Sequence, residues 1–73
     1  MNNEKTFNIM SKYIKVHINN EVIYLNPEFI VGLEPYKDCE TILHLSYPYY
    51  TNNNILIVNE DMHSMCRMLN IEE

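Results

Sequence analysis

The sequence predicts a small, mainly β domain of the α+β class. We expect an antiparallel five-stranded sheet or partly open barrel with a C-terminal helix, and a possible short N-terminal helix or arm. Three observations predict this class. Apolar and polar residues alternate between positions 14 and 18, as in a half-buried strand. Residues 55–58 form an unbroken apolar run, and apolar residues recur at helical spacing between positions 62 and 69.

The length of the chain limits its core. Because it has 73 residues, we expect one domain, with residues 1–12 as an N-terminal tail or arm and residues 13–73 as the β-rich body. A chain of this length buries roughly 60% of its unfolded surface, so small domains commonly add disulfides, metals or partner subunits. Cys39 and Cys66 are too few for a disulfide framework. They form either a single bridge or two buried free thiols, and we expect a homo-oligomer.

The charge of the chain excludes several partners. The formal net charge is −5, Arg67 is the only arginine, and the lysines are dispersed, which argues against binding of long nucleic acid. No apolar run approaches the roughly 18 residues of a membrane span, and the first residues lack the layout of a signal peptide. We therefore expect a cytoplasmic protein. Its Asn-, Ile- and Tyr-rich composition is typical of an AT-rich genome, bacterial or viral.

The first half of the chain predicts a hairpin and a corner. Residues 13–18 alternate as one strand, Asn19-Asn20 tolerates the positive φ of a tight turn, and Glu21–Leu25 returns as the second strand. Asn26-Pro27-Glu28 then predicts one helical or 3₁₀ turn, since Asn caps helices, Pro suits the first helical position and an acid favours the dipole. Phe7 and Met10, upstream, lie at helical spacing, which leaves a short helix, a frayed tail or an arm on a neighbouring subunit open.

The second half predicts three strands and a helix. The third strand covers about residues 30–34, contains Gly32 at a bulge or close backbone approach, and ends at Pro35. Residues 41–47 form the fourth strand, and residues 55–58 a fifth strand buried on both faces. For the helix we expect Asn59 as the N-cap and an apolar stripe of Met62, Met65, Cys66 and Leu69.

With this hairpin, corner and final helix, the chain resembles the flagellar FlbD-like family of small bacterial proteins. The resemblance covers residues 13–69, and its most specific motif is the corner Leu25-Asn26-Pro27-Glu28-Phe29-Ile30. It implies a β-hairpin fold with a final helix, a role linked to flagellar and swarming motility, and no catalytic residues. The chain differs in a longer, aromatic connection at Tyr47 to Asn54 and in the added residues 1–12. A divergent, phage-encoded relative would have these features.

The aromatic connection is the predicted ligand-binding site. Tyr47, Tyr49 and Tyr50 offer ring faces for stacking, and Asn52 and Asn53 offer amide donors and acceptors. The rings could equally cover the small core or form a subunit interface, where tyrosine is enriched. Aromatic neighbours on both sides of Pro48 also allow a cis peptide bond.

Catalysis, metals and cofactors are not expected. His63 and Cys66 could share a helix face, but two ligands do not make a metal site. Carboxylates at Glu34, Asp38 and Glu40 have no visible partner for acid–base chemistry, and they suit a solvated loop. The methionines of the last helix suit the core and subunit contacts better than a soft binding face.

The sequence therefore predicts a non-catalytic binding or adaptor module that acts as a homo-oligomer. Its partner is either a protein or a small nucleotide-like ligand. The alternative function is a phage counter-defence protein that sequesters a cyclic nucleotide or similar small signal in a tyrosine-lined intersubunit pocket. In that case Tyr36, Lys37 and Arg67 complete the ligand site, with the two cations facing the phosphate.

Overall fold

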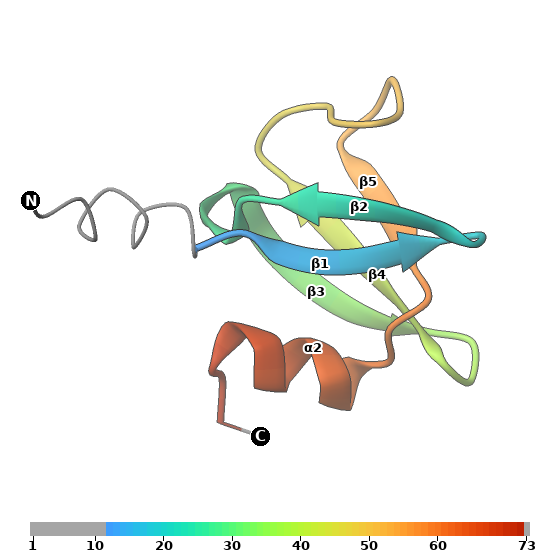
Figure 1. Cartoon of the computed structure of the whole chain (residues 1–73), viewed down its shortest axis with the longest axis vertical. Helices are drawn as coiled ribbons and strands as arrows, with labels where there is room; N and C mark the ends of the chain where they lie inside the picture. Colours follow the sequence, from blue (N-terminus) through green and yellow to red (C-terminus); the bar gives the residue numbers. More distant parts are fainter. Residues whose placement is uncertain (1–11, 73) are drawn as a thin grey trace, which may run out of the picture.

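A computed structural model describes residues 12–72, which form five strands, one 3₁₀ turn and one helix in two layers. The first layer holds the hairpin of β1 (Ile14–Ile18) and β2 (Glu21–Leu25) together with α2 (Met62–Leu69). The second layer is a sheet of β3 (Ile30–Tyr36), β4 (Glu40–Leu45) and β5 (Ile55–Val58), in the order β3-β4-β5. Figure 1 shows the hairpin crossing in front of this sheet, with α2 beside it (Figure 1).

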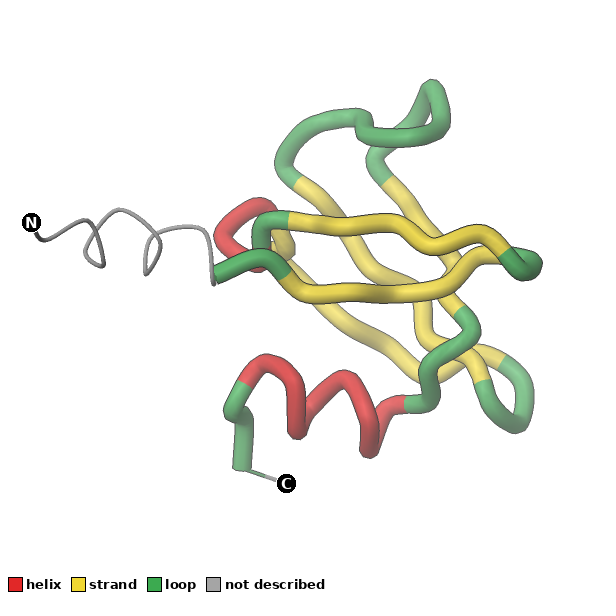
Figure 2. Tube along the Cα trace, viewed as in Figure 1, coloured by secondary structure: helices red, strands yellow, loops and turns green. Residues whose placement is uncertain are grey.

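The predicted five-stranded sheet or barrel is wrong, because the strands divide into two antiparallel sheets of two and three strands. After β2, the 3₁₀ turn η1 (Pro27–Phe29) redirects the chain into the second layer, as Figure 2 shows by its red turn (Figure 2). The mainly β class with a C-terminal helix is confirmed. The possible N-terminal helix or arm lies outside the described residues.

The core fills the space between the two layers. Its buried residues alternate along the strands, and Met65 of α2 completes it: Val16, Ile23, Leu25, Leu43, Leu45, Leu56, Val58 and Met65. Met65 and Cys66 are both buried, so the predicted apolar stripe of the helix is confirmed. Both cysteines are free, and Cys39 is exposed, contrary to the expectation that both thiols are buried.

Both predicted turns of the first half are confirmed. Asn19 and Asn20 adopt φ values of 50° and 73°, which close the hairpin with Ile18 opposite Glu21. At the corner, the Asn26 side chain accepts a hydrogen bond of 3.0 Å from the N–H of Glu28. This bond satisfies a donor that the short turn would otherwise leave unpaired.

β3 runs through Pro35 to Tyr36, past the predicted end at Pro35. The Ser46 N–H donates to the Phe29 carbonyl at 2.8 Å. The backbone N–H and C=O groups of every second residue of β4, counted back from Ser46, therefore point toward β3. In this register Glu34 and Tyr36 bond to β4, and the nitrogen of Pro35 faces the open edge of the sheet. Proline is tolerated there because its missing N–H removes no ladder bond.

Gly32 lies at a bulge, as predicted, because the register shifts between Ile30 and Gly32. A Cβ atom at this position would meet the Cβ of His44 at 3.6 Å, which is an ordinary contact. We therefore expect Gly32→Ala to change the free energy of unfolding by less than about 0.5 kcal/mol. Urea unfolding measures this change, and a large loss of stability would mean that the bulge itself requires glycine.

β5 is exposed on one face, contrary to the prediction that both faces are buried. Leu56 and Val58 are buried, whereas Ile55 and Ile57 are 41% and 39% exposed. The hairpin and α2 cover only the inner face of the sheet, and β5 is an edge strand. β4 ends at Leu45, two residues before the predicted end, and leaves Tyr47 exposed in the following loop.

Asp61, and not the predicted Asn59, is the N-cap of α2. Its side chain accepts a hydrogen bond of 2.8 Å from the Ser64 N–H, which lowers the pKa of the Asp61 carboxyl. Asn70 ends the helix in the left-handed conformation, with φ 61°. Asn59 and Glu60 therefore lie before the helix, where they have another role.

Asn59 and Glu60 join the two layers, and we call them the 59–60 junction. The Asn59 N–H donates to the His17 carbonyl at 2.8 Å, and the Asn59 side chain accepts from the Asn19 N–H at 2.8 Å. The Glu60 carboxylate accepts from the His17 N–H at 3.0 Å and contacts His17 Nδ1 at 2.6 Å. The buried Thr41 hydroxyl donates to the Glu60 carbonyl at 2.8 Å. The junction thus connects β1 to β4 and β5.

Candidate functional site

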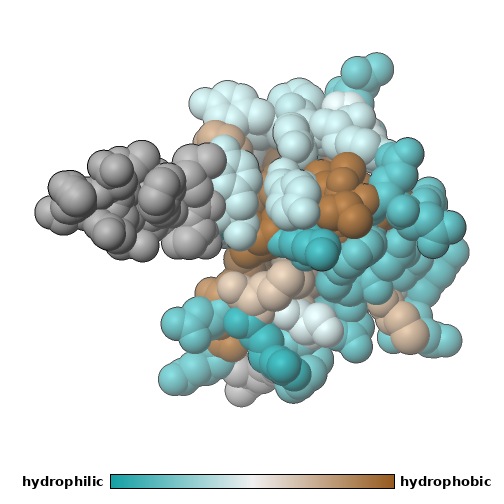
Figure 3. Space-filling model, viewed as in Figure 1, coloured by the Kyte–Doolittle hydropathy of each residue, from teal (hydrophilic) through white to brown (hydrophobic). Residues whose placement is uncertain are grey.

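Five aromatic side chains surround the open edge of β2, and we call them the tyrosine surface: Tyr24, Phe29, Tyr47, Tyr49 and Tyr50. Each is between 41% and 61% exposed. They come from β2, from η1 and from the loop between β4 and β5, which lies above β2 (Figure 1). Figure 3 shows pale side chains in the upper half of the molecule, beside an apolar area (Figure 3).

Hydrogen bonds hold two of these rings against β2. Because Glu21 and Ile18 flank the two-residue turn, the backbone of Tyr24 faces away from β1. The Tyr49 hydroxyl donates to the Tyr24 carbonyl at 2.9 Å, and the Tyr50 hydroxyl donates to the Glu21 carboxylate. The loop therefore covers part of the strand edge while its ring faces stay accessible.

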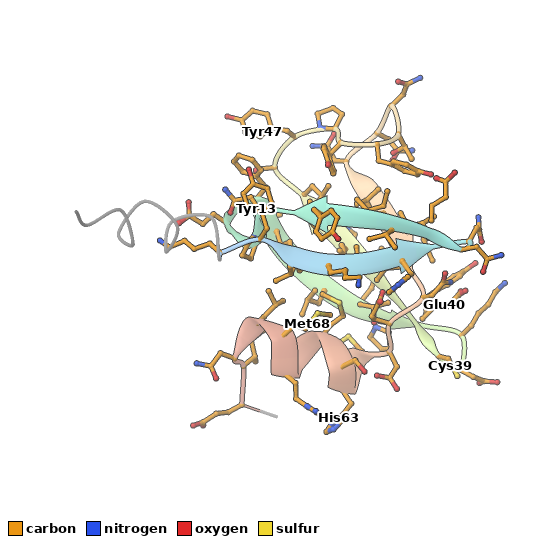
Figure 4. The ribbon with its side chains drawn as sticks, in the orientation of Figure 1. Tyr13, Cys39, Glu40, Tyr47, His63 and Met68 are labelled. Carbon is orange, nitrogen blue, oxygen red and sulfur yellow. The ribbon has the colours of Figure 1, made fainter. Side chains whose placement is uncertain are left out.

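A ring contact holds a third member of the surface. Phe29 and Tyr47 meet edge to face, with ring centroids 5.3 Å apart and an interplanar angle of 85°. Figure 4 shows Tyr47 extending from the loop at the upper left (Figure 4). All peptide bonds of the described residues are trans, including the bond before Pro48, where the sequence allowed either form.

The Glu21 carboxylate raises the pKa of Tyr50, chiefly by accepting its hydrogen bond. This bond stabilises the protonated hydroxyl in the fold, so its contribution is present at neutral pH and is lost as the pH rises through the raised pKa. We expect Glu21→Gln to return the Tyr50 pKa toward its ordinary value in an NMR titration of ¹³C-labelled tyrosine. Glu28→Gln removes another exposed carboxylate and should leave Tyr50 unchanged, and an equal fall there would contradict the assignment.

The other predicted site residues fall into two further places. Tyr36, Lys37 and Asn53 line a groove of about 490 Å³ along β5, the β5-edge groove. Its remaining lining comes from the end of β1 and the turn after it, the start of β4, the loop before β5, β5 itself and the junction: Ile18, Asn19, Glu40, Thr51, Ile55, Leu56, Ile57 and Asn59. Asn52 is exposed in the loop above. Arg67 lies on α2 beside Lys15 and Glu60, at the opposite side of the molecule from the loop (Figure 1).

One protomer therefore brings the three loop tyrosines together, but it does not bring Arg67 to them. Sequence reasoning missed Tyr24 and Phe29. Tyr24 follows the buried Ile23 and precedes the buried Leu25, so strand alternation already indicated that its ring is exposed. The position of Phe29 beside Tyr47 depends on tertiary packing.

An apolar groove of about 580 Å³ separates α2 from the edge of β3. Its lining includes Val31, Leu33, Met62, Cys66 and Leu69. Within residues 12–72, no three side chains of His, Cys, Asp or Glu lie close enough together to hold a metal ion. No helix in the same range is long and apolar enough to cross a membrane.

Comparisons with protein-family models, with curated proteins and with solved structures give no match for this chain. The resemblance to the FlbD-like family therefore remains a prediction. The function has to be inferred from the surfaces described above.

Proposed function

We propose that this chain is a non-catalytic binding or adaptor module that acts as a homo-oligomer and docks through the tyrosine surface. The observation that carries the proposal is the combination of exposure and restraint at these rings. Tyr49 and Tyr50 are tied to β2 through their hydroxyls, and Tyr47 is packed on Phe29. Their ring faces nevertheless stay exposed.

Fixed aromatic rings suit a protein interface for two reasons. Tyrosine supplies a large contact area and a polar group, and it is enriched at interfaces and among the residues that dominate binding energy. A ring that is already held in place also loses little conformational entropy when a partner binds. A second copy is the partner expected first, because a 73-residue chain has a small core of its own.

Light scattering coupled to size-exclusion chromatography tests the oligomer. The expected mass is a multiple of the 8.8 kDa chain mass. Tyr24→Ala and Tyr47→Ala should each weaken association at least about tenfold, as expected for residues at the centre of an interface. Tyr36→Ala, at the β3–β4 turn, is the matched control and should leave association unchanged. A mass of 8.8 kDa at all concentrations would contradict the proposal.

A second candidate function is sequestration of a cyclic nucleotide or similar small signal, as in phage counter-defence. It is supported by Tyr36, Lys37 and Asn53, three of the predicted ligand residues, which line one groove. A site that also used Arg67 and the loop tyrosines would require neighbouring subunits, since these groups lie at opposite sides of one protomer. Titration calorimetry with a cyclic nucleotide panel should give heat at tens of micromolar protein, roughly the range for micromolar affinity. Absence of heat for every nucleotide would rule this function out.

A further inference from the structure

The backbone of β5 alternates between its partner strand and an open edge. The Leu45 N–H donates to the Asn54 carbonyl at 2.8 Å, so the backbone groups of Leu45 face β5. Antiparallel pairing alternates with period two, which directs the groups of Leu56 and Val58 toward β4. The N–H and C=O of Ile55 and Ile57 therefore face away from the sheet.

The positions on both sides of Ile57 are already used. The Ile55 N–H donates to Asn53 Oδ1 at 3.0 Å, and the Thr51 hydroxyl lies 3.4 Å from the Ile55 carbonyl, one of three acceptors within its reach. Beyond Ile57, the Asn59 N–H donates to the His17 carbonyl at 2.8 Å. Among these positions of β5, Ile57 alone presents a donor and an acceptor to the groove. An added β-strand needs successive open positions, so this edge suits a small ligand better than a peptide.

The groove around Ile57 has the dimensions and composition of a ligand site. Its volume of about 490 Å³ lies within the usual range for small-molecule sites, roughly 300–1,000 Å³. Tyr36 lines it with an aromatic ring, which carries the Lys37 ammonium 5.2 Å from its centroid. Ile55 and Ile57 add apolar side chains on the sheet face that no described element covers.

We propose that the β5-edge groove binds a planar nitrogen heterocycle of the nucleobase type. The heterocycle donates to the Ile57 carbonyl and accepts from the Ile57 N–H through two neighbouring atoms of one edge, and it packs against Tyr36. Adenine and guanine both carry such a donor next to an acceptor. The proposal rests on the second candidate function and names the part of the ligand that one protomer recognises.

The charges around the groove favour recognition of the base over recognition of a phosphate. Lys37 is the only cation among the lining residues, and Glu40 adds a carboxylate to the same groove, which accepts from Asn59 Nδ2 at 3.2 Å. The chain as a whole carries a net charge of −5. An uncharged nucleoside should therefore suffice for binding.

The test uses the full chain, labelled with ¹⁵N, in a titration with adenosine and with purine riboside, which lacks the amino donor. Adenosine should produce saturable shifts at the amides of Tyr36, Lys37 and Ile57. Purine riboside should bind roughly 2- to 12-fold more weakly, the ratio for one hydrogen bond. Equal affinities, an absence of saturable shifts, or shifts confined to other residues would overturn the proposal.

Two variants measure separately how the Tyr36 ring and the Ile57 N–H contribute to nucleoside binding. Tyr36→Ala should weaken adenosine binding about 5- to 150-fold, the range for one base stacked on an aromatic ring. Tyr13→Ala removes an exposed tyrosine that belongs to neither the β5-edge groove nor the tyrosine surface, and it should leave adenosine binding unchanged. Ile57→Pro removes the outward N–H but no ladder bond, as Pro35 does in β3, and should weaken both nucleosides. If Ile57→Pro does not fold, the comparison of adenosine with purine riboside on the unaltered chain still tests the proposal.

The result for the β5-edge groove can be distinguished from the results for the two proposed functions. Cyclic nucleotide heat together with shifts at the loop tyrosines would support the second candidate function and overturn this site. Nucleoside shifts at Ile57 without oligomerisation would support this site and contradict docking of a second copy.

Discussion

Leu43→Ala is expected to lower the free energy of unfolding by about 3 kcal/mol, since truncation of a buried leucine removes apolar contacts and leaves a cavity. Leu43 is fully buried at the centre of the sheet, with Leu33 and Leu56 opposite it on the neighbouring strands. Domains of this size have total stabilities of roughly 4–10 kcal/mol, so the variant should lose a large fraction of its stability and unfold at a clearly lower urea concentration. Urea unfolding followed by circular dichroism measures the change.

The neighbouring Ile42 provides the matched control for this experiment. It lies on the same strand, but its side chain points to the outer face and is only partly buried. Ile42→Ala should therefore lose less than about 1 kcal/mol of unfolding free energy. Equal losses at the two positions would mean that the outer face is covered in solution, as a subunit interface would cover it.

Glu60→Ala is expected to have the second-largest effect, a loss of about 2 kcal/mol in unfolding free energy, which corresponds to about 10 °C in melting temperature. The Glu60 carboxylate is 15% exposed and bonds to both the backbone and the ring of His17. Its removal leaves the His17 N–H without this acceptor and loosens the connection between the two layers.

Glu60→Gln separates the hydrogen bonds from the charge. The amide oxygen can still accept from the His17 N–H, so roughly half of the loss should be recovered. Differential scanning calorimetry compares the two variants with the unaltered chain. A melting temperature of Glu60→Ala equal to that of the unaltered chain would show that the 59–60 junction does not stabilise the domain.

The features that the sequence predicted correctly depend on residues close together in the chain. Asn19-Asn20 closes its own turn, Asn26 caps a turn that begins at the next residue, and the stripe of α2 follows from helical spacing. The burial pattern of β1 follows in the same way from strand alternation. Each of these signals is complete within a few residues.

The features that the sequence did not predict depend on which strands become neighbours. The separation into two sheets, the exposed face of β5 and the tolerance of Pro35 all follow from the order of the strands, which leaves β3 and β5 at edges. Asn59 and Glu60 have the composition of a helix start, but their side chains bond to β1 residues far away in sequence. Local propensity does not contain this information.

The candidate site shows the same division. The exposure of Tyr47, Tyr49 and Tyr50 could be predicted from their position in a polar loop. Their restraint by Tyr24, Glu21 and Phe29 could not, because it requires the loop to lie along β2. The separation of Arg67 from these rings likewise appears only in the folded chain.

The 59–60 junction also determines the order in which the domain can assemble. The hairpins β1–β2 and β3–β4 close over short turns, so they can form early with only a small loss of chain entropy. The bond between His17 and Glu60 joins residues 43 positions apart and requires both layers to be in place. We expect the junction to form after the rate-limiting step of folding, so that weakening it accelerates unfolding and leaves the folding rate nearly unchanged. The junction would then control how long the native state persists.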